Sequence, residues 1–205
     1  MTMSQDKNIE RFENLLRSTE RYNIEALISF IRKSDFYTAP ASTKYHSCHE
    51  GGLLEHTLHV YDCLKEKTKT YPYDQYDFQD RNLIIAALLH DICKTYFYDI
   101  EYKNKKVYSE TGAKSDSNGR FDWVTVPGYT VNDRFPYGHG EKSVMIAESY
   151  IQLEPVEKYA IRWHMGFTEP KESWNTLSAA IRKYPLVLAL HTADLEATYL
   201  LEEEE

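Results

Sequence analysis

The stretch LIIAALLHDIC, residues 83–93, decides the fold because it is apolar nearly all the way round. A helix without a polar face has to be covered by other elements on every side, so we expect this segment at the centre of the core. Its end breaks the pattern, since His90 and Asp91 are ionisable. Buried imidazole and carboxylate groups need partners, and this pair therefore also indicates where chemistry could take place.

Helical periodicity extends on both sides of this segment. It predicts two amphipathic helices within residues 1–34 and a third helix entered through Gly51 and Gly52. Helical spacing returns at Val144, Ala147 and Ile151, then at Val156, Tyr159, Ala160 and Trp163, and finally at Val187, Leu190, Leu195 and Tyr199. Between them, residues 96–131 alternate in polarity around Asn118-Gly119, which predicts an inserted β-hairpin. We expect an all-α helical bundle with a small β-hairpin, forming one domain over residues 1–205.

Composition restricts the possible partners. The 205 residues carry a formal net charge of −8, which does not favour collection of long nucleic acid, so we expect a small substrate. The N-terminal stretch lacks a basic region followed by an apolar one, and no apolar run is long enough for a bilayer. The three cysteines form no C-x-x-C pair. We expect a cytoplasmic chain with reduced thiols, no membrane partner and a solvated LEEEE tail; the sequence does not indicate its oligomeric state.

Ionisable residues recur on the apolar helices. A single buried histidine is more often a hydrogen-bonded core residue than a ligand, but four ionisable groups together favour a divalent metal, which satisfies them with one atom. Two more histidines, one between glycines and one just before a glycine, extend the set to a second ion. The candidate ligands are His56, His90, Asp91, His139, His164 and Asp194.

The order of these residues, with the local texts EGGLLEHTL, LLHDICK and HTADLEAT, resembles the HD superfamily of metal-dependent phosphohydrolases in its six-ligand, two-metal form. The resemblance covers roughly residues 35–200. The stretch from KYH through GGLLEHT is also similar to the HD domain of a bacterial 3′ to 5′ exoribonuclease. That enzyme has an additional nucleic-acid-binding domain, which this chain is too short to contain.

The resemblance implies two divalent ions, whose identity (manganese, iron, nickel, zinc or magnesium) the residues do not set. It assigns His139 and His164 to the second ion, with Asp91 bridging, and the other ligands to the first: His56, His90 and Asp194, together with Asp91. Where several relatives have a His-His pair, this chain has Trp163-His164, so the second site has one imidazole fewer nearby.

Metal chemistry then predicts hydrolysis of a phosphoester by a metal-activated water. Asp91 and Lys94 are the expected catalytic residues, because Lys94 follows Asp91 by three positions and can contact a phosphate or steady the carboxylate. Expected substrate contacts are His46, Lys94, Tyr98 and Trp123. A zinc site from His46, Cys48 and His49 is a weaker alternative, since a second half is missing.

The expected substrate is a nucleotide or short oligonucleotide, with the hairpin as a lid whose aromatic rings stack on the base. Aromatic residues on a hairpin more often simply pack together. One alternative is a 3′ to 5′ exonuclease on single strands, in which Lys103, Lys105 and Lys106 form a local basic patch. Another is a metal-stabilised nucleotide-binding module without turnover.

Overall fold

The apolar segment forms helix α4 (Asp80–Leu89) in the computed structural model, which describes residues 3–44 and 47–202. Every residue from Asn82 to Leu89 is buried. The side chains of α4 belong to two hydrophobic clusters, one shared mainly with α1, α2 and α3 and the other with α3, α6 and α8. The prediction that this segment lies in the core is therefore confirmed.

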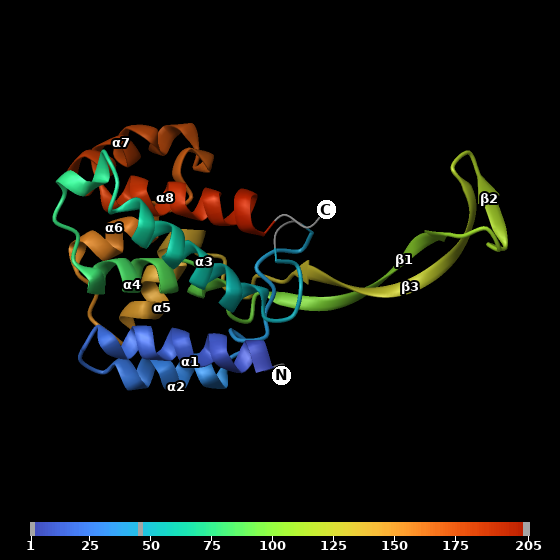
Figure 1. The fold of residues 1–205 in the computed structure, drawn as a ribbon, viewed down its shortest axis with the longest axis horizontal. Helices are drawn as coiled ribbons and strands as arrows, with labels where there is room; N and C mark the ends of the chain where they lie inside the picture. The colour runs from blue at the N-terminus through green and yellow to red at the C-terminus, as the bar shows by residue number, and fades with distance from the viewer. Residues whose placement is uncertain (1–2, 45–46, 203–205) are drawn as a thin grey trace.

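Seven further α-helices complete the helical body in the described residues (Figure 1). They are α1 (Met3–Ser18), α2 (Ile24–Lys33), α3 (Gly52–Lys67), α5 (His139–Glu148), α6 (Pro155–Trp163), α7 (Trp174–Lys183) and α8 (Leu186–Glu196). Short 3-10 turns lie at Tyr73–Gln75, Ile92–Lys94, Gly166–Thr168 and Lys171–Ser173, and a π-helical turn, η5 (Ala197–Leu201), follows α8. None of the described helices is long and apolar enough to cross a membrane.

The bundle is held by apolar faces of the kind that the periodicity predicts. In α2, for example, Ile24, Leu27, Ile28 and Ile31 are buried. Full burial of such a side chain is worth about 1.5–3 kcal/mol. Where α5 crosses α6, a Cβ on Gly140 would lie 2.2 Å from the carbonyl oxygen of Arg162. Only glycine permits this approach, which brings the start of α5 against the end of α6.

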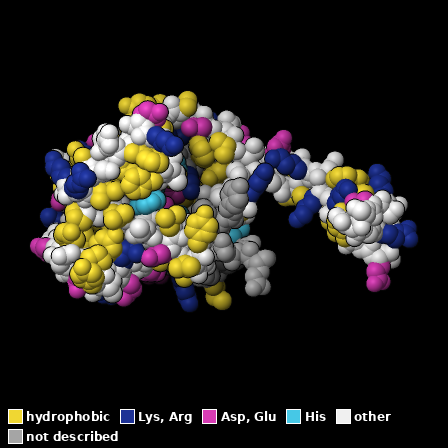
Figure 2. All heavy atoms as spheres, turned by 90° about the horizontal axis from the view of Figure 1, so that it is seen from above, with side chains coloured by type: hydrophobic (Ala, Val, Ile, Leu, Met, Phe, Trp, Pro, Cys, Tyr) yellow, Lys and Arg dark blue, Asp and Glu magenta, His cyan; other side chains and the backbone are white. Residues whose placement is uncertain are grey.

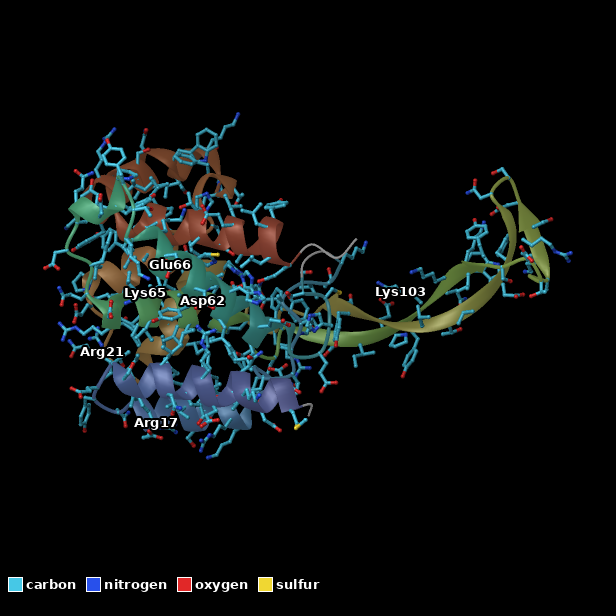
Figure 3. All side chains as sticks on the ribbon, in the orientation of Figure 1. Arg17, Arg21, Asp62, Lys65, Glu66 and Lys103 are labelled. Carbon is cyan, nitrogen blue, oxygen red and sulfur yellow. The ribbon has the colours of Figure 1, made fainter. Side chains whose placement is uncertain are left out.

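A buried polar contact joins three parts of the bundle. Glu157 of α6 is fully buried and forms a close ion pair with Arg21, which lies in the loop between α1 and α2 (Figure 3). The Asn82 amide donates to Glu157 at 3.0 Å and to Glu154 at 2.9 Å. This network satisfies the buried Asn82 amide and links the start of α4 to α6, which is linked in turn to the loop between α1 and α2.

The inserted segment is a long antiparallel ribbon. Strand β1 (Tyr98–Tyr108) pairs with β3 (Gly119–Val131) along its whole length, and the short β2 (Lys114–Asp116) pairs with the start of β3. The strand order is β1-β3-β2, and the turn between β2 and β3 contains Asn118 as predicted. The small sheet in an otherwise helical protein agrees with the expected hairpin.

The ribbon projects from the helical body instead of covering it (Figure 1). Space-filling spheres show it as a separate arm with hydrophobic and basic side chains near its end (Figure 2). Lys103 lies on the free part of this arm (Figure 3). The expected lid is therefore wrong for this structure, because the strands pair with each other and leave the bundle at their base.

Two other details differ from the sequence-based expectations. Helix α4 ends at Leu89, so that His90 caps it and Asp91 begins a 3-10 turn instead of continuing the helix. Helix α7 was not predicted at all. It buries only Leu177 and Ala180 of its ten residues, which is too short a pattern to stand out beside the preceding polar segment.

Candidate metal centre

Five helices bring the six predicted ligands together. Two ligands lie within a helix: His56 on α3 and Asp194 on α8. The other four ligands lie at helix ends: His90 caps α4, Asp91 follows it, His139 is the first residue of α5, and His164 caps α6. Gly138 precedes α5 with φ of 93°, a conformation that favours glycine and lets the chain turn sharply before His139.

Three overlapping groups of these side chains could each hold a metal ion. They are His56 with His90 and Asp91, His90 with His164 and Asp194, and Asp91 with His139 and His164. Within each group the ligand atoms lie within 4.8 Å of one another. All six candidate ligands thus lie in one cluster. The only sequence signal for this cluster is that these ionisable residues lie on apolar helices.

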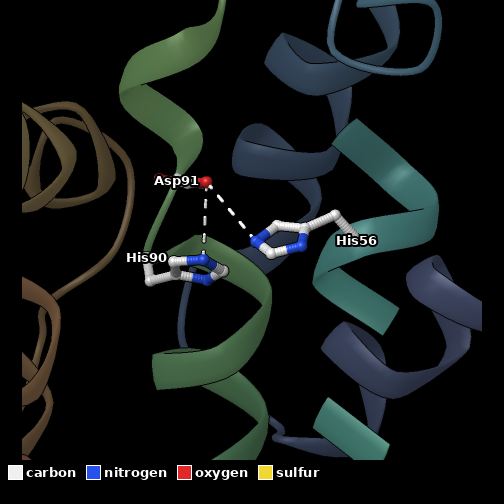
Figure 4. A group of neighbouring side chains, drawn as sticks. All are labelled: His56, His90 and Asp91. Carbon is white, nitrogen blue, oxygen red and sulfur yellow. Dashed lines mark ion pairs between the residues drawn. The ribbon is translucent and has the colours of Figure 1, made fainter. Parts of the chain in front are cut away.

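Asp91 is the centre of this arrangement. Its Oδ2 lies 3.7 Å from Nε2 of His56 and 3.5 Å from Nε2 of His90 (Figure 4). Its Oδ1 lies 2.7 Å from Nε2 of His139 and 3.6 Å from Nε2 of His164. The two oxygens of one carboxylate therefore face two different pairs of imidazoles. Asp194 lies beside the first pair, with Oδ1 3.2 Å from Nε2 of His56.

The ring tautomers leave lone pairs directed at this centre. A carbonyl oxygen only accepts, so His90 must donate from Nδ1 to Ala87 at 2.7 Å, and His164 must donate from Nδ1 to Ile161 at 2.7 Å. Each Nε2 then carries a lone pair. The Nε2 of His90 is fully buried and has no hydrogen-bond partner in the described part of the chain. A buried imidazole nitrogen of this kind fits a metal ion, so the residues present suit the expected group.

The charges in the site also suit a cation. Burial lowers the pKa of His90 to about 4, so that its imidazole is neutral at physiological pH. Burial alone would raise the pKa of Asp91, but Lys94 and the neighbouring histidines hold it well below its ordinary value. Burial alone would also raise the pKa of Asp194, but the neighbouring histidines, His56 above all, together hold it below its ordinary value. Two ionised carboxylates therefore lie among the imidazoles, and a divalent ion would balance them.

Lys94 is committed to the same carboxylate. Its Nζ lies 2.6 Å from Oδ2 of Asp91 and donates to the carbonyl oxygen of Ala41 at 2.7 Å. The hydroxyl of Tyr98, at the base of β1, donates to the same carbonyl at 3.0 Å. Lys94 was expected either to contact a phosphate or to steady the Asp91 carboxylate, and in this structure it contacts Asp91. Tyr98 lies beside it, on the same carbonyl of Ala41.

The other predicted substrate contacts lie elsewhere. Trp123 pairs with Lys106, eight residues along β1 from Tyr98, which corresponds to roughly 26 Å of strand. Its ring packs against Phe121 and Lys106 in the outer half of the arm. The structure therefore separates Trp123 from the metal cluster, and a mononucleotide could not contact both. His46 lies outside the described residues.

Sequence reasoning missed two partners of the ligand histidines. The carboxylate of Glu202 lies 3.1 Å from Nδ1 of His56, and the sulfur of Cys93 lies 3.3 Å from Nδ1 of His139. Glu202 is 6% exposed, so the expected solvated tail is wrong at this residue. The sequence signal for the Glu202 contact was the presence of His56 and His59 on one face of α3, because two neighbouring imidazoles favour a nearby carboxylate.

Comparison with known proteins identifies the family. A family model described as HD domain matches residues 53–195, a range that includes all six candidate ligands. The chain belongs to the HD domain family. Neither a curated protein nor a solved structure matches it significantly. HD domains form a superfamily of metal-dependent phosphohydrolases that bind divalent metals, and the His/Asp cluster of this HD domain is suited to that role.

Proposed function

We propose that this HD domain is a phosphohydrolase with a binuclear metal site that cleaves a phosphoester bond of a nucleotide or short oligonucleotide. The observation that supports this most is the placement of Asp91, whose two oxygens face separate histidine pairs. In the proposed assignment Asp91 is shared by both ions. His56, His90 and Asp194 complete the first site, and His139 and His164 hold the second.

Two divalent ions in such a site lower the pKa of a bound water and neutralise charge on the phosphoryl oxygens. The protein's own contribution is to fix the donors. His90 and His164 each donate a hydrogen bond from Nδ1–H to a backbone carbonyl, which directs Nε2 inward. Lys94 neutralises part of the charge on Asp91 through a 2.6 Å contact and restrains that carboxylate in one orientation.

The substrate assignment rests on charge and on the arm. Residues 98–131 contain five basic and five acidic side chains, and Lys106 is already paired with Asp116 at 2.6 Å. The formal charge of the arm is therefore balanced, which does not favour a long strand held mainly by phosphate contacts. In the proposed pose, phosphate lies at the metal cluster and the rest of a small substrate lies toward Tyr98; His46 remains a proposed contact.

The experiment is hydrolysis and binding of mononucleotides, cyclic nucleotides, and RNA and DNA oligomers of increasing length, with added Mn²⁺ and at two salt concentrations. We expect metal-dependent cleavage whose affinity saturates within a few nucleotides. Affinity that keeps rising beyond about ten nucleotides, with a steep salt slope, would contradict this and favour the exonuclease. Tight binding without cleavage of any substrate would favour the non-catalytic module.

A further inference from the structure

Glu202 is a buried carboxylate that contacts three donors. It follows the π-helical turn η5 and is 6% exposed. Nδ1 of His56 lies 3.1 Å from both of its oxygens, and Nδ1 of His59 lies 2.9 Å from Oε1. The hydroxyl of Ser47 donates to Oε2 at 2.9 Å. Such a group would be costly to bury without these partners, so its position is well defined.

The position of His56 within its helix explains why an external acceptor is needed. His90 and His164 cap their helices, where the last carbonyls are free, and each ring donates to the carbonyl three residues earlier. His56 lies in the second turn of α3 (Gly52–Lys67), where the carbonyls are already engaged in the helix. A group from another element can orient an imidazole there, and Glu202 contacts Nδ1 of this ring.

The carboxylate is connected to the proposed first metal site through one ring. Nδ1 of His56 contacts Glu202, while Nε2 of the same ring lies 3.2 Å from Asp194 and 3.7 Å from Asp91. Helix α8 and η5 run toward the N-terminal part of α3 (Figure 1). One continuous segment thus supplies Asp194 directly to the cluster and, eight residues later, the carboxylate that contacts His56.

We propose that Glu202 is a positioning residue for the first metal site. Its carboxylate accepts a hydrogen bond from Nδ1–H of His56. This hydrogen bond fixes the tautomer whose lone pair is on Nε2 and makes Nε2 a stronger metal ligand. His59 and Ser47 hold the carboxylate in place. The inference rests on the first metal site of the proposed function, but it concerns metal binding and does not require that any phosphoester be the substrate.

The experiment compares Glu202→Gln, Glu202→Ala and Glu202→Asp in the full chain. Metal-free protein is titrated with Co²⁺, and both the dissociation constant and the visible absorption spectrum are recorded. We expect Gln and Ala to weaken the tighter Co²⁺ site about 10- to 100-fold and to change its spectrum, with Asp recovering part of the loss. Glu196→Gln is the matched control, since Glu196 lies on the same segment but pairs with Lys67.

A wild-type dissociation constant and an unchanged Co²⁺ spectrum in Glu202→Gln would overturn the proposal. Because Gln keeps the shape of the side chain, the Glu202→Gln variant tests the proposal even if Glu202→Ala unfolds. Thermal melting of the metal-free variants shows whether either one unfolds. A purely structural role would lower the melting temperature without changing the spectrum, and would also overturn it. If wild-type protein shows Glu202-dependent Co²⁺ binding but cleaves no phosphoester, the proposed function fails and the positioning role stands.

Discussion

Each ligand imidazole presents Nε2 to the cluster, and a different group contacts its Nδ1. The partners are the carbonyls of Ala87 and Ile161 for the two helix-capping histidines, the Glu202 carboxylate for His56, and the Cys93 sulfur for His139. Backbone partners come with the helix ends and follow from local structure. The Glu202 and Cys93 partners depend on packing between distant segments, which no local sequence pattern specifies.

Replacement of Asp91 tests the shared ligand. We expect Asp91→Ala to lower metal content and to abolish metal-dependent phosphohydrolase activity, because the two oxygens of Asp91 face different histidine pairs. The measurements are metal analysis of the purified variant and the initial rate on its best substrate. Asp62→Ala, which removes a surface carboxylate paired with Arg11, is the control. Near-normal turnover with two ions bound would contradict the bridging assignment.

Replacement of His164 tests the division between the two sites. We expect His164→Ala to lose one of two bound ions and to reduce turnover by orders of magnitude while the fold is retained, because His164 faces Oδ1 of Asp91 on the side of His139. Metal stoichiometry and circular dichroism report these effects separately. His49→Ala removes an imidazole outside the cluster and should bind both ions. Loss of both ions together with unfolding would make His164 a structural residue.

At the scale of elements, the sequence predicts most helices because each buries a recognisable apolar face. It also predicts the ribbon, since alternation and Asn118 are local signals. It does not predict the end of α4 at Leu89, because the apolar pattern continues through Ile92 and Cys93, which are both buried in the following turn. It misses α7, whose only buried residues are Leu177 and Ala180.

A buried carboxylate joins α1 to α2 and gives a pH-dependent contribution to stability. Glu13 is 4% exposed, accepts from Nε of Arg32 at 2.6 Å, and contacts the hydroxyl of Tyr37 and the guanidinium of Arg17. The hydrogen bond from Arg32 holds the pKa of Glu13 below its ordinary value of 4.5. Because the folded-state pKa is lower than the unfolded one, the stabilisation is complete above about pH 4.5 and is lost as pH falls through the folded value.

We expect Glu13→Gln to cost about 1–3 kcal/mol of unfolding free energy at pH 7, because it removes the charge of a buried carboxylate that accepts hydrogen bonds from Arg32 and Arg17. The difference from wild type should be constant between pH 6 and 8 and should shrink below about pH 4.5. Urea unfolding across this range measures it. Glu25→Gln, at an exposed partner of Arg17, should change stability far less. An equal difference at pH 3 and pH 7 would refute this account of Glu13.

At the scale of the whole molecule, a helical body carries the candidate metal cluster and an antiparallel arm extends from it (Figure 1). The direction of the arm could not be predicted, since strand pairing and turn residues are local whereas its orientation depends on contacts at the base. One such contact is the hydrogen bond from Tyr98 to Ala41. Beyond the base, β1 and β3 pair mainly with each other, from Glu101↔Gly128 outward.

Shortening the arm tests its independence from the site. Replacing residues 101–128 by an Asn-Gly turn should leave the helical body folded, with metal content unchanged and a melting temperature within a few degrees of wild type, because the strands of the arm pair with one another and not with the body. Activity on a mononucleotide should also persist. Loss of mononucleotide hydrolysis with metal retained would show that the arm contacts small substrates after all.

The central claim is that one carboxylate, that of Asp91, is shared by two metal ions. Crystals of the Mn²⁺-loaded protein, with anomalous data collected near the manganese edge, test it most directly. We predict two anomalous peaks about 3.5–4 Å apart, one beside His56 and His90 and the other beside His139 and His164, with Asp91 between them. A single peak that Asp91 does not contact, or no peak within the six-residue cluster, would contradict the account.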